Sequence, residues 1–321
     1  MERPASIETR DLVKIYRGRR GAPPIRALDG LSLRVGAGEI FGLLGRNGAG
    51  KTTLLRILTT LTRPSAGSAL LLGMDVEAEP ERVRQAICAV LQENAVEIFL
   101  SVVDNLATYA RFHSIPRAEV SRRIERALEL FDLTEVRHQK VIDLSGGLKR
   151  RVQVAKVFMV DRPVVFLDEA TTGMDPINKR VTMEAIREEA GRGRTILLTT
   201  QVLQEAEELC DRIAIIDRGK TVVQGDLRTI RALSSRAFDL TITFEAISDE
   251  LLEELRQLPL LKLSHKHTTV ELCVKGKEFS ALEILSAIAR RHQILHFEVS
   301  GATLEDVFLE LLGPHATEDR A

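Results

Sequence analysis

A glycine-rich segment in the N-terminal part of the chain has the residue types of a phosphate-binding loop. Residues 45–52 fit the pattern GxxxxGK[ST] and lie between the apolar run 40–44 and a helix-like run. Glycine lets backbone N–H groups approach phosphate oxygens, and the helix that follows presents its positive end to them. We therefore predict that Lys51 reaches the β and γ phosphates of a nucleotide and that Thr52 binds Mg²⁺. The residues predicted to contact the nucleotide in this segment are Gly45, Arg46, Asn47, Gly48, Ala49, Gly50, Lys51, Thr52 and Thr53.

Two adjacent carboxylates stand at the end of a second apolar run. Asp168 and Glu169 directly follow residues 164–167, VVFL, which have the pattern of a buried strand. On its own such a pair is most often a charge pair at the start of a helix. Together with the phosphate loop, it predicts Asp168 as a Mg²⁺ partner through water and Glu169 as the base that polarises the attacking water.

The composition is that of a folded protein without a strong electrostatic bias. Of 321 residues, 44% are hydrophobic and 28% are charged, and 45 basic residues nearly balance 46 acidic ones. This length allows two domains of about 150 residues each. The net charge of −1 excludes the general basic field of nonspecific nucleic-acid binders, so no nucleic-acid partner is expected.

Cysteine usage and hydropathy bear on the compartment. Cys88, Cys210 and Cys273 lie far apart, in neither the spacing of a metal site nor an even-numbered disulfide framework. This favours a reducing cytoplasm. The first residues lack the apolar region of a signal peptide, and no stretch suits a transmembrane helix. If the protein works at a membrane, we expect a partner to supply the membrane span.

The elements that must position these residues are predicted to be α/β units around a mostly parallel sheet, over residues 1–230. Residues 93–160 lose the strand pattern and become helical, which predicts a helical subdomain within this domain. The runs that predict buried strands are 40–44, 164–167, 195–199 and 212–216.

A second, smaller α+β domain is predicted over residues 235–314, followed by a tail at 315–321. Its elements are expected in the order β-α-β-β-α-β, as in ferredoxin-like folds. The predicted segments are a strand at 238–244, a helix at 249–257, strands at 260–264 and 269–274, a helix at 279–291 and a strand around 295–299. Thr303 and Asp306 predict the cap of a last helix that ends at Gly313.

A segment just before the acidic strand gives the most specific resemblance. Residues 144–151, LSGGLKRR, resemble the LSGGQ signature of ATP-binding cassette (ABC) proteins. The resemblance covers about residues 5–228 and implies the P-loop NTPase fold of an ABC nucleotide-binding domain. It also implies a homodimer in which ATP on one copy meets the signature of the other. The signature residues predicted to do so are Ser145, Gly146 and Gly147.

The same resemblance assigns roles to further positions. It implies that Tyr16 stacks on the adenine and that Gln92 contacts Mg²⁺ and the attacking water. Residues 172–175 resemble the D-loop, with Asp175 as its acidic residue. Gln201 stands where the family usually has the switch histidine, so we predict a catalytic contact to the γ-phosphate from a side chain that cannot carry a proton. Leu148 replaces the usual signature glutamine.

Both departures, and residues 303–309, are similar to exporter ATPases of the daunorubicin-resistance type. The resemblance implies an ATP-hydrolysing subunit that energises a separate membrane permease for multidrug or antibiotic export, cytoplasmic and peripheral on the inner face of the membrane. Two alternatives stay open. One is a non-transport ABC ATPase, which usually has two cassettes or coiled coils in the chain. The other is a nucleotide-responsive regulator in which Gln201 has made hydrolysis negligible, although Glu169 argues against it.

For three other features, a structural explanation is favoured over a functional one. His292 and His296 are four residues apart, but the alternation around Leu295 predicts a strand there, so we expect no metal site. The basic run 17–20 is expected to be a solvated loop. The apolar segment 99–106 either packs within the helical subdomain or docks a helix of a membrane subunit.

Overall fold

The computed structural model describes residues 4–18, 23–91, 96–233, 238–258, 260–274, 278–301 and 303–313. The chain divides into two compact units, Met1–Asp226 and Leu227–Ala321. Gln92, the basic residues Arg19 and Arg20, and the predicted tail 315–321 lie outside the described residues. Among the described residues, no helix combines the length and apolar character needed to cross a membrane.

The centre of the first unit is a six-stranded sheet in the order β10-β9-β3-β8-β7-β6. All neighbours pair in parallel except β10, which runs antiparallel to β9. Every residue of β3 and β7 is buried, as their continuous apolar runs predict. The strands are β3 (Ile40–Leu44), β6 (Ile87–Val90), β7 (Val164–Asp168), β8 (Thr195–Thr200), β9 (Arg212–Asp217) and β10 (Lys220–Asp226). The four buried strands predicted from the sequence are therefore confirmed.

A second sheet of the same unit is antiparallel. Its order is β2-β1-β4-β5, and it shares a hydrophobic core with β3 and with the helix that follows the phosphate loop. Phe41 and Leu54 are fully buried in this core. The elements are β1 (Ala5–Tyr16), β2 (Ile25–Gly36), β4 (Ala66–Leu71), β5 (Met74–Asp75), α1 (Lys51–Leu58) and α2 (Pro80–Ala86).

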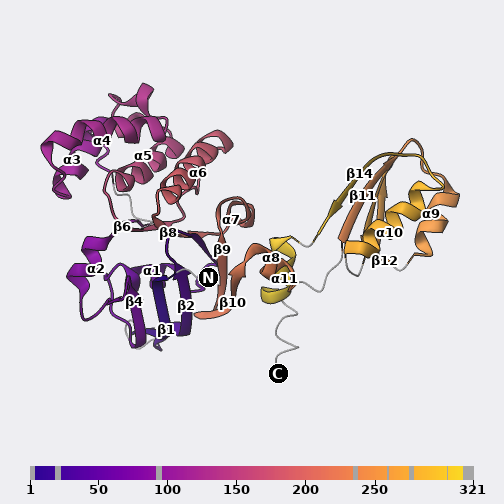
Figure 1. The fold of residues 1–321 in the computed structure, drawn as a ribbon, viewed down its shortest axis with the longest axis horizontal. Coiled ribbons are helices and arrows are strands. Elements are labelled where there is room, and N and C mark those ends of the chain that lie inside the picture. The colour runs from indigo at the N-terminus through magenta and orange to yellow at the C-terminus, as the bar shows by residue number, and fades with distance from the viewer. Residues whose placement is uncertain are drawn as a thin grey trace. The chain divides into compact units, whose positions relative to one another are not determined.

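The stretch predicted to be helical contains α3 (Val102–Phe112), α4 (Arg117–Leu130) and α5 (Gly146–Phe158). Within residues 96–160 no strand is assigned, in agreement with the loss of strand pattern. Figure 1 shows these helices together on one side of the first unit, opposite the antiparallel sheet. Helix α6 (Pro176–Gly191) packs on α5, and α7 (Leu203–Leu209) follows β8.

The second unit contains a four-stranded antiparallel sheet in the order β12-β13-β11-β14. Its elements follow one another as β-α-β-β-α-β, preceded and followed by one helix. They are α8 (Leu227–Arg231), β11 (Phe238–Phe244), α9 (Asp249–Arg256), β12 (Leu260–Lys266), β13 (Thr269–Val274), α10 (Glu278–Ala289), β14 (Ile294–Ser300) and α11 (Leu304–Leu312). Thr303 and Asp306 form the predicted capping box of α11.

The two histidines with helical spacing do not share a helix. Helix α10 ends at Ala289 and β14 begins at Ile294, so His292 lies between them and His296 lies in the strand. The imidazole Nε2 of His292 is 2.9 Å from Oε2 of Glu254, which places it in a polar contact between α9 and the end of α10. Strand β14 is an edge strand.

Candidate functional site

The predicted phosphate loop connects β3 to α1 and depends on glycine at two positions. Gly50 has φ +110°, and a Cβ there would lie 2.7 Å from the carbonyl oxygen of Ala27 and from a side-chain carbon of Leu28. A Cβ on Gly45 would lie 2.4 Å from the carbonyl oxygen of Ile216. Both approaches are too close for any larger residue, so the loop is held tightly between β2 and β9.

Lys51 is the first residue of α1 and is 7% exposed. Its ammonium group donates hydrogen bonds to the carbonyl oxygens of Gly45 at 2.6 Å and Arg46 at 3.1 Å. Burial lowers the pKa of Lys51, and the carboxylates of Glu169 and Asp168 oppose this shift. Since the first turn of α1 holds no acidic residue, the loop, the lysine and the helix N-terminus together form a cradle suited to an anion.

Asp168, the last residue of β7, lies beside the phosphate loop and is 1% exposed. Its carboxylate accepts a hydrogen bond from Oγ1 of Thr52 at 3.3 Å and one from Oγ1 of Thr199 at 2.5 Å. The structure thus brings together Thr52 and Asp168, two of the three residues predicted to surround Mg²⁺.

Glu169 adopts a backbone conformation that is unusual for a residue with a side chain, with φ +52°. Its N–H group donates to the backbone oxygen and to Oγ1 of Thr199, both at 3.1 Å. Its carboxylate accepts a hydrogen bond from Nε2 of Gln201 at 2.6 Å. The two predicted catalytic residues are therefore in direct contact, and strand β8 fixes the position of both.

Arg150 is a site residue that sequence reasoning missed. From the first half of α5, its guanidinium donates to the backbone oxygens of Asp168 and, at 3.1 Å, Glu169. Burial lowers the pKa of Arg150, and the negative charges of the Asp168 and Glu169 carboxylates oppose this shift. Arg150 and Glu169 also line a hollow of about 350 Å³ with residues of the signature and the D-loop. Arg150 lies within the signature-like segment 144–151, but that pattern does not indicate its contact with the acidic strand, which only the fold creates.

Glu205 on α7 is the second missed residue. It is 5% exposed, and its Oε2 accepts hydrogen bonds from the hydroxyl groups of Thr171 and Thr200, each at 2.7 Å. Its Oε1 lies 2.8 Å from Nζ of Lys179 on α6. One buried carboxylate thus connects the segment after Glu169, the end of β8 and the helix that follows the D-loop.

The signature and the D-loop lie side by side. Ser145 caps α5, since its hydroxyl accepts a hydrogen bond from the N–H of Leu148 at 3.3 Å, and both Ser145 and Gly146 are exposed. A Cβ on Gly147 would lie 3.6 Å from Cα of Met174. Asp175 caps α6, and its hydrogen bonds with Asn178 lower the pKa of its carboxyl group.

Tyr16 is the last residue of β1 and is half-buried. It pairs with Ile25 of β2, two residues before Ala27, whose carbonyl borders Gly50. The Nζ atom of Lys14 lies 5.1 Å from the centroid of the tyrosine ring. This strand end therefore lies beside the strand that borders the phosphate loop, while contact with an adenine remains a prediction.

Comparison with known proteins agrees with this geometry. The profile of the ABC transporter family matches residues 28–172. The daunorubicin/doxorubicin resistance ATP-binding protein of Streptomyces peucetius is 35% identical over 98% of this chain and 94% of its own length. The doxorubicin resistance ATP-binding protein of Mycobacterium tuberculosis is 41% identical over 71% of this chain and 69% of its own length. The Nod factor export ATP-binding protein I of Ralstonia nicotianae is 35% identical over 89% of both chains.

Solved structures give the same result for the fold. The ATP-binding subunit of an ABC transporter aligns with a TM-score of 0.62 and 28% identity, over 70% of this chain and 92% of its own. CbiO1 of Clostridium perfringens, described as part of an ABC transporter complex, aligns with a TM-score of 0.63 and 26% identity, over 71% and 91%. The predicted nucleotide-binding fold is thereby confirmed. The chain belongs to the ABC transporter family, as an ATP-binding protein related to those of daunorubicin and doxorubicin resistance.

Proposed function

We propose that this chain is the ATP-hydrolysing subunit of an ABC exporter for antibiotic-like drugs and that it energises a separate membrane permease. One observation carries the hydrolytic part: Glu169 and Gln201 are in contact at 2.6 Å beside the carboxylate of Asp168 and the phosphate loop. The export part rests on relatives named for daunorubicin and doxorubicin resistance. The relatives named for drug resistance and for Nod factor export support this function over a regulatory or nucleic-acid-binding one.

The residues present fit a nucleotide with Mg²⁺. The loop around Gly50 excludes a Cβ, as an anion cradle requires, and Lys51 supplies a buried positive charge. Thr52 and Asp168 offer a hydroxyl and a carboxylate, which are oxygen ligands of the kind that Mg²⁺ prefers. We assign both to the metal, Asp168 through water, with Gln92 as a further ligand. When bound, Mg²⁺ would neutralise charge that develops on the phosphates.

The proposed hydrolysis gives each residue one task. Lys51 exchanges its bonds with the loop carbonyls for bonds with the β and γ phosphates. Gln201 donates to Oε1 of Glu169, which leaves Oε2 of Glu169 to accept a proton from the attacking water. The water oxygen bonds to the γ-phosphorus, the bond from that phosphorus to the β–γ bridging oxygen breaks, and ADP leaves. The second N–H of the Gln201 amide is available to the γ-phosphate.

We propose that two copies bind ATP between them. The support is the exposure of Ser145 and Gly146 at the start of α5, next to the hollow that Glu169 lines. The start of a helix offers a second anion site through its backbone N–H groups. ATP that is bound to the phosphate loop of another copy could occupy this site. In this arrangement Asp175 would lie at the contact between copies, and one copy alone would hydrolyse ATP slowly.

The remaining assignments follow from the same proposal. We place the chain in the cytoplasm, peripheral on the inner face of the membrane through its permease. We propose residues 1–230 as the ATPase domain, with a helical subdomain at about 93–160, and residues 235–314 as an accessory domain. The sheet order β12-β13-β11-β14 supports a ferredoxin-like fold for the accessory domain.

The test is co-purification from detergent-solubilised membranes of the native host, with mass spectrometry and an ATPase assay on the same sample. We expect a multi-span protein to be retained and ATP turnover to be lost in Glu169→Gln. Glu208→Gln, the same type of change on the exposed face of α7, serves as the control and should retain both partner and turnover. Recovery of ribosomes or DNA, or of no membrane protein, would contradict the proposal.

A further inference from the structure

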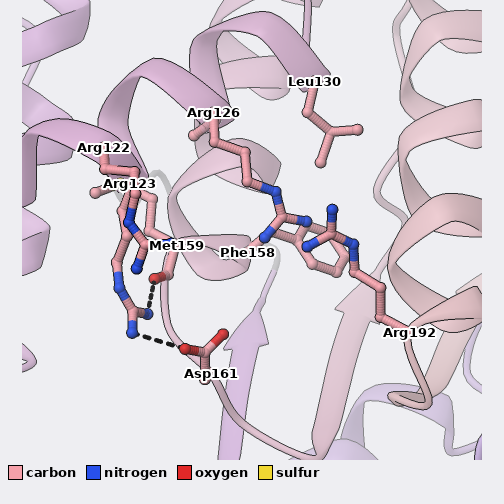
Figure 2. Close-up of a pocket in the computed structure, with 9 residues that line it drawn as sticks. Arg122, Arg123, Arg126, Leu130, Phe158, Met159, Asp161 and Arg192 are labelled. Carbon is pink, nitrogen blue, oxygen red and sulfur yellow. Dashed lines mark hydrogen bonds and ion pairs between the residues drawn. The ribbon is translucent and has the colours of Figure 1, made fainter. Parts of the chain in front are cut away.

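A pocket of about 250 Å³ lies in the first unit, away from the nucleotide site, where α4, the end of α5 and the end of α6 meet. Four of the nine residues that line it are arginines, and one is an aspartate. In the view of Figure 2, Arg126 and Arg192 extend toward each other across the ring of Phe158, while Arg122 and Arg123 lie on the other side. The apolar lining consists of the half-buried Leu130 and of Ala127, Phe158 and Met159, which are buried.

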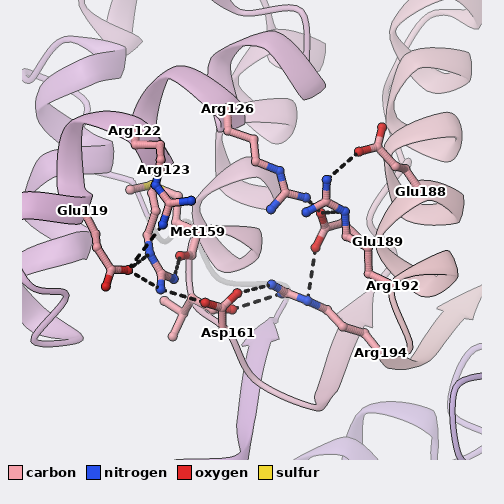
Figure 3. A network of polar contacts seen from close by, with 11 residues as sticks. Glu119, Arg122, Arg123, Arg126, Met159, Asp161, Glu188, Glu189, Arg192 and Arg194 are labelled. Atoms are coloured by element: carbon pink, nitrogen blue, oxygen red, sulfur yellow. Dashed lines mark hydrogen bonds and ion pairs between the residues drawn. The ribbon is translucent and has the colours of Figure 1, made fainter.

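The arginines around the pocket outnumber the carboxylates by one: Arg122, Arg123, Arg126, Arg192 and Arg194 share Glu119, Asp161, Glu188 and Glu189. Glu189, which is fully buried, pairs with Arg126, with Arg192 at 3.7 Å and with Arg194 at 3.1 Å, so three guanidinium groups share one carboxylate (Figure 3). Arg192 also contacts Glu188 at 3.2 Å on the surface. Guanidinium groups gathered around one carboxylate repel one another, and an additional anion would offset that repulsion.

Two arginines of this network have a structural task. Arg123 donates to the carbonyl oxygen of Met159 at 2.7 Å, and Arg194 donates to that of Val160 at 3.0 Å. Both also pair with Asp161, so they satisfy the carbonyl groups at the C-terminal end of α5. These bonds explain why Arg123 and Arg194 are present, but they do not involve the other arginines.

Arg122, Arg126 and Arg192 remain directed to the pocket and to solvent. Their side chains are 78%, 36% and 49% exposed, and the acidic group paired with Arg122 is 3.8 Å away. Each guanidinium has five N–H donors, in a planar fork that matches a carboxylate or a phosphate. Within the described residues, the protein groups around the pocket therefore engage only part of the donor capacity of these three arginines.

We propose that this pocket binds a small organic oxyanion, a carboxylate or phosphate ester, whose apolar part packs on the half-buried Leu130. The charge selects an anion, and the apolar lining selects one with a hydrophobic body rather than an inorganic ion. The volume lies below the common range of about 300–1,000 Å³ for ligand sites, which limits the ligand to a small molecule.

The site is separate from the nucleotide site. It lies at the C-terminal ends of α5 and α6, whose N-terminal ends carry Ser145 and Asp175. With a rise of about 1.5 Å per residue, α5 alone separates its two ends by about 20 Å. None of the nine residues that line the pocket belongs to the phosphate loop, the acidic strand end or the signature, so a ligand there would bind without competing with ATP.

Isothermal titration calorimetry on the full chain, with ADP in saturating excess, tests the proposal with benzoate and phenyl phosphate as probes. We expect saturable binding of at least one probe and none of benzyl alcohol, which keeps the ring without the charge. Affinity should fall about tenfold or more in Arg126→Ala/Arg192→Ala, because charge-assisted hydrogen bonds are lost. Arg180→Ala, an 82% exposed arginine on α6, is the matched control and should bind like the parent.

The titrations with the two probes also show which oxyanion the site prefers, because benzoate and phenyl phosphate carry different charged groups on the same ring. Arg122→Ala provides a second variant in which folding is not at risk, because its side chain is largely exposed. We expect it to weaken binding as well. Absence of saturable binding of both probes, equal binding of benzyl alcohol, or unchanged affinity in both arginine variants would overturn the proposal.

Discussion

Replacing Gln201 by histidine should make ATP hydrolysis depend on pH in a way that the parent protein does not. The Gln201 amide group has two N–H donors at every pH, one of which is bonded to Glu169 at 2.6 Å. A neutral imidazole has only one N–H, whereas the protonated ring has two. Gln201→His can therefore donate to Glu169 and to the γ-phosphate together only while the ring is protonated.

The magnitude follows from the distance to Glu169. At 2.6 Å, Coulomb's law in a water-like dielectric gives about 1.6 kcal/mol, which suits the exposed position of Gln201. That energy raises the pKa of the new imidazole by about one unit from 6.5, to about 7.5. Because the raised pKa favours the charged form, the two-donor state is present below this pH and is lost as the pH rises through it.

The assay is kcat at saturating ATP and Mg²⁺ between about pH 6 and pH 9. We expect kcat of Gln201→His to fall about tenfold across the new limb, as one hydrogen bond to a charged group is lost. Gln204→His places an imidazole beside Glu208, where Gln204 now bonds at 2.9 Å, and should show no new limb. A parent profile that already has such a limb, or a Gln201→His profile without one, would refute this role of Gln201.

Three further perturbations test the packing around the site. Glu205→Gln should lower kcat about tenfold while leaving KM for ATP within about twofold, since it weakens charge-assisted contacts among segments that hold Glu169 and not contacts to the nucleotide. Gly50→Ala should lower the free energy of unfolding by about 1–3 kcal/mol and abolish binding of a fluorescent ATP analogue, because of its φ of +110° and the close carbonyl. Burial raises the pKa of Cys88 to about 12 and also raises that of Cys210, so a thiol reagent at pH 8 should label Cys273 first, with all three thiols reacting in denaturant.

Matched variants distinguish these effects from general damage. Glu208→Gln lies on the exposed side of α7 and should leave kcat unchanged. Gly73→Ala introduces a Cβ at another positive φ, +79°, but with nothing within 4 Å, and should leave nucleotide binding intact. Equal losses in either control, or rapid labelling of Cys88 in the native protein, would contradict the structural explanation.

Local sequence was sufficient for the elements whose pattern is continuous. Strands β3 and β7 are buried on both faces, so their uninterrupted apolar runs were recognisable without knowledge of their neighbours. The spacing of residues 45–52 and the adjacency of Asp168 and Glu169 likewise identified one site, because both follow parallel strands whose carboxyl ends meet at the same sheet edge.

The contacts that support this site could not be derived from local sequence. Arg150 on α5 bonds to the backbone oxygen of Asp168 at the end of β7, and Glu205 binds threonines from two other segments. Such partners are set by long-range packing. Arg150 lies within the signature-like segment 144–151, but that pattern does not indicate this contact, and Glu205 stands in no recognised motif. One local signal was present: Thr199 and Thr200 are polar residues at the end of a fully buried strand, where hydroxyl groups need partners.

The central claim is that Glu169 activates water at a nucleotide site shared by two copies of the chain. The most direct test measures the molar mass of Glu169→Gln by light scattering, with and without ATP and Mg²⁺, beside its rate of ATP turnover. We predict a dimer that forms only with ATP, turnover reduced about 10²-fold or more, and no dimer when Lys51→Ala is added. A Glu169→Gln protein that hydrolyses ATP at the parent rate, or that stays monomeric with ATP bound, would contradict the claim.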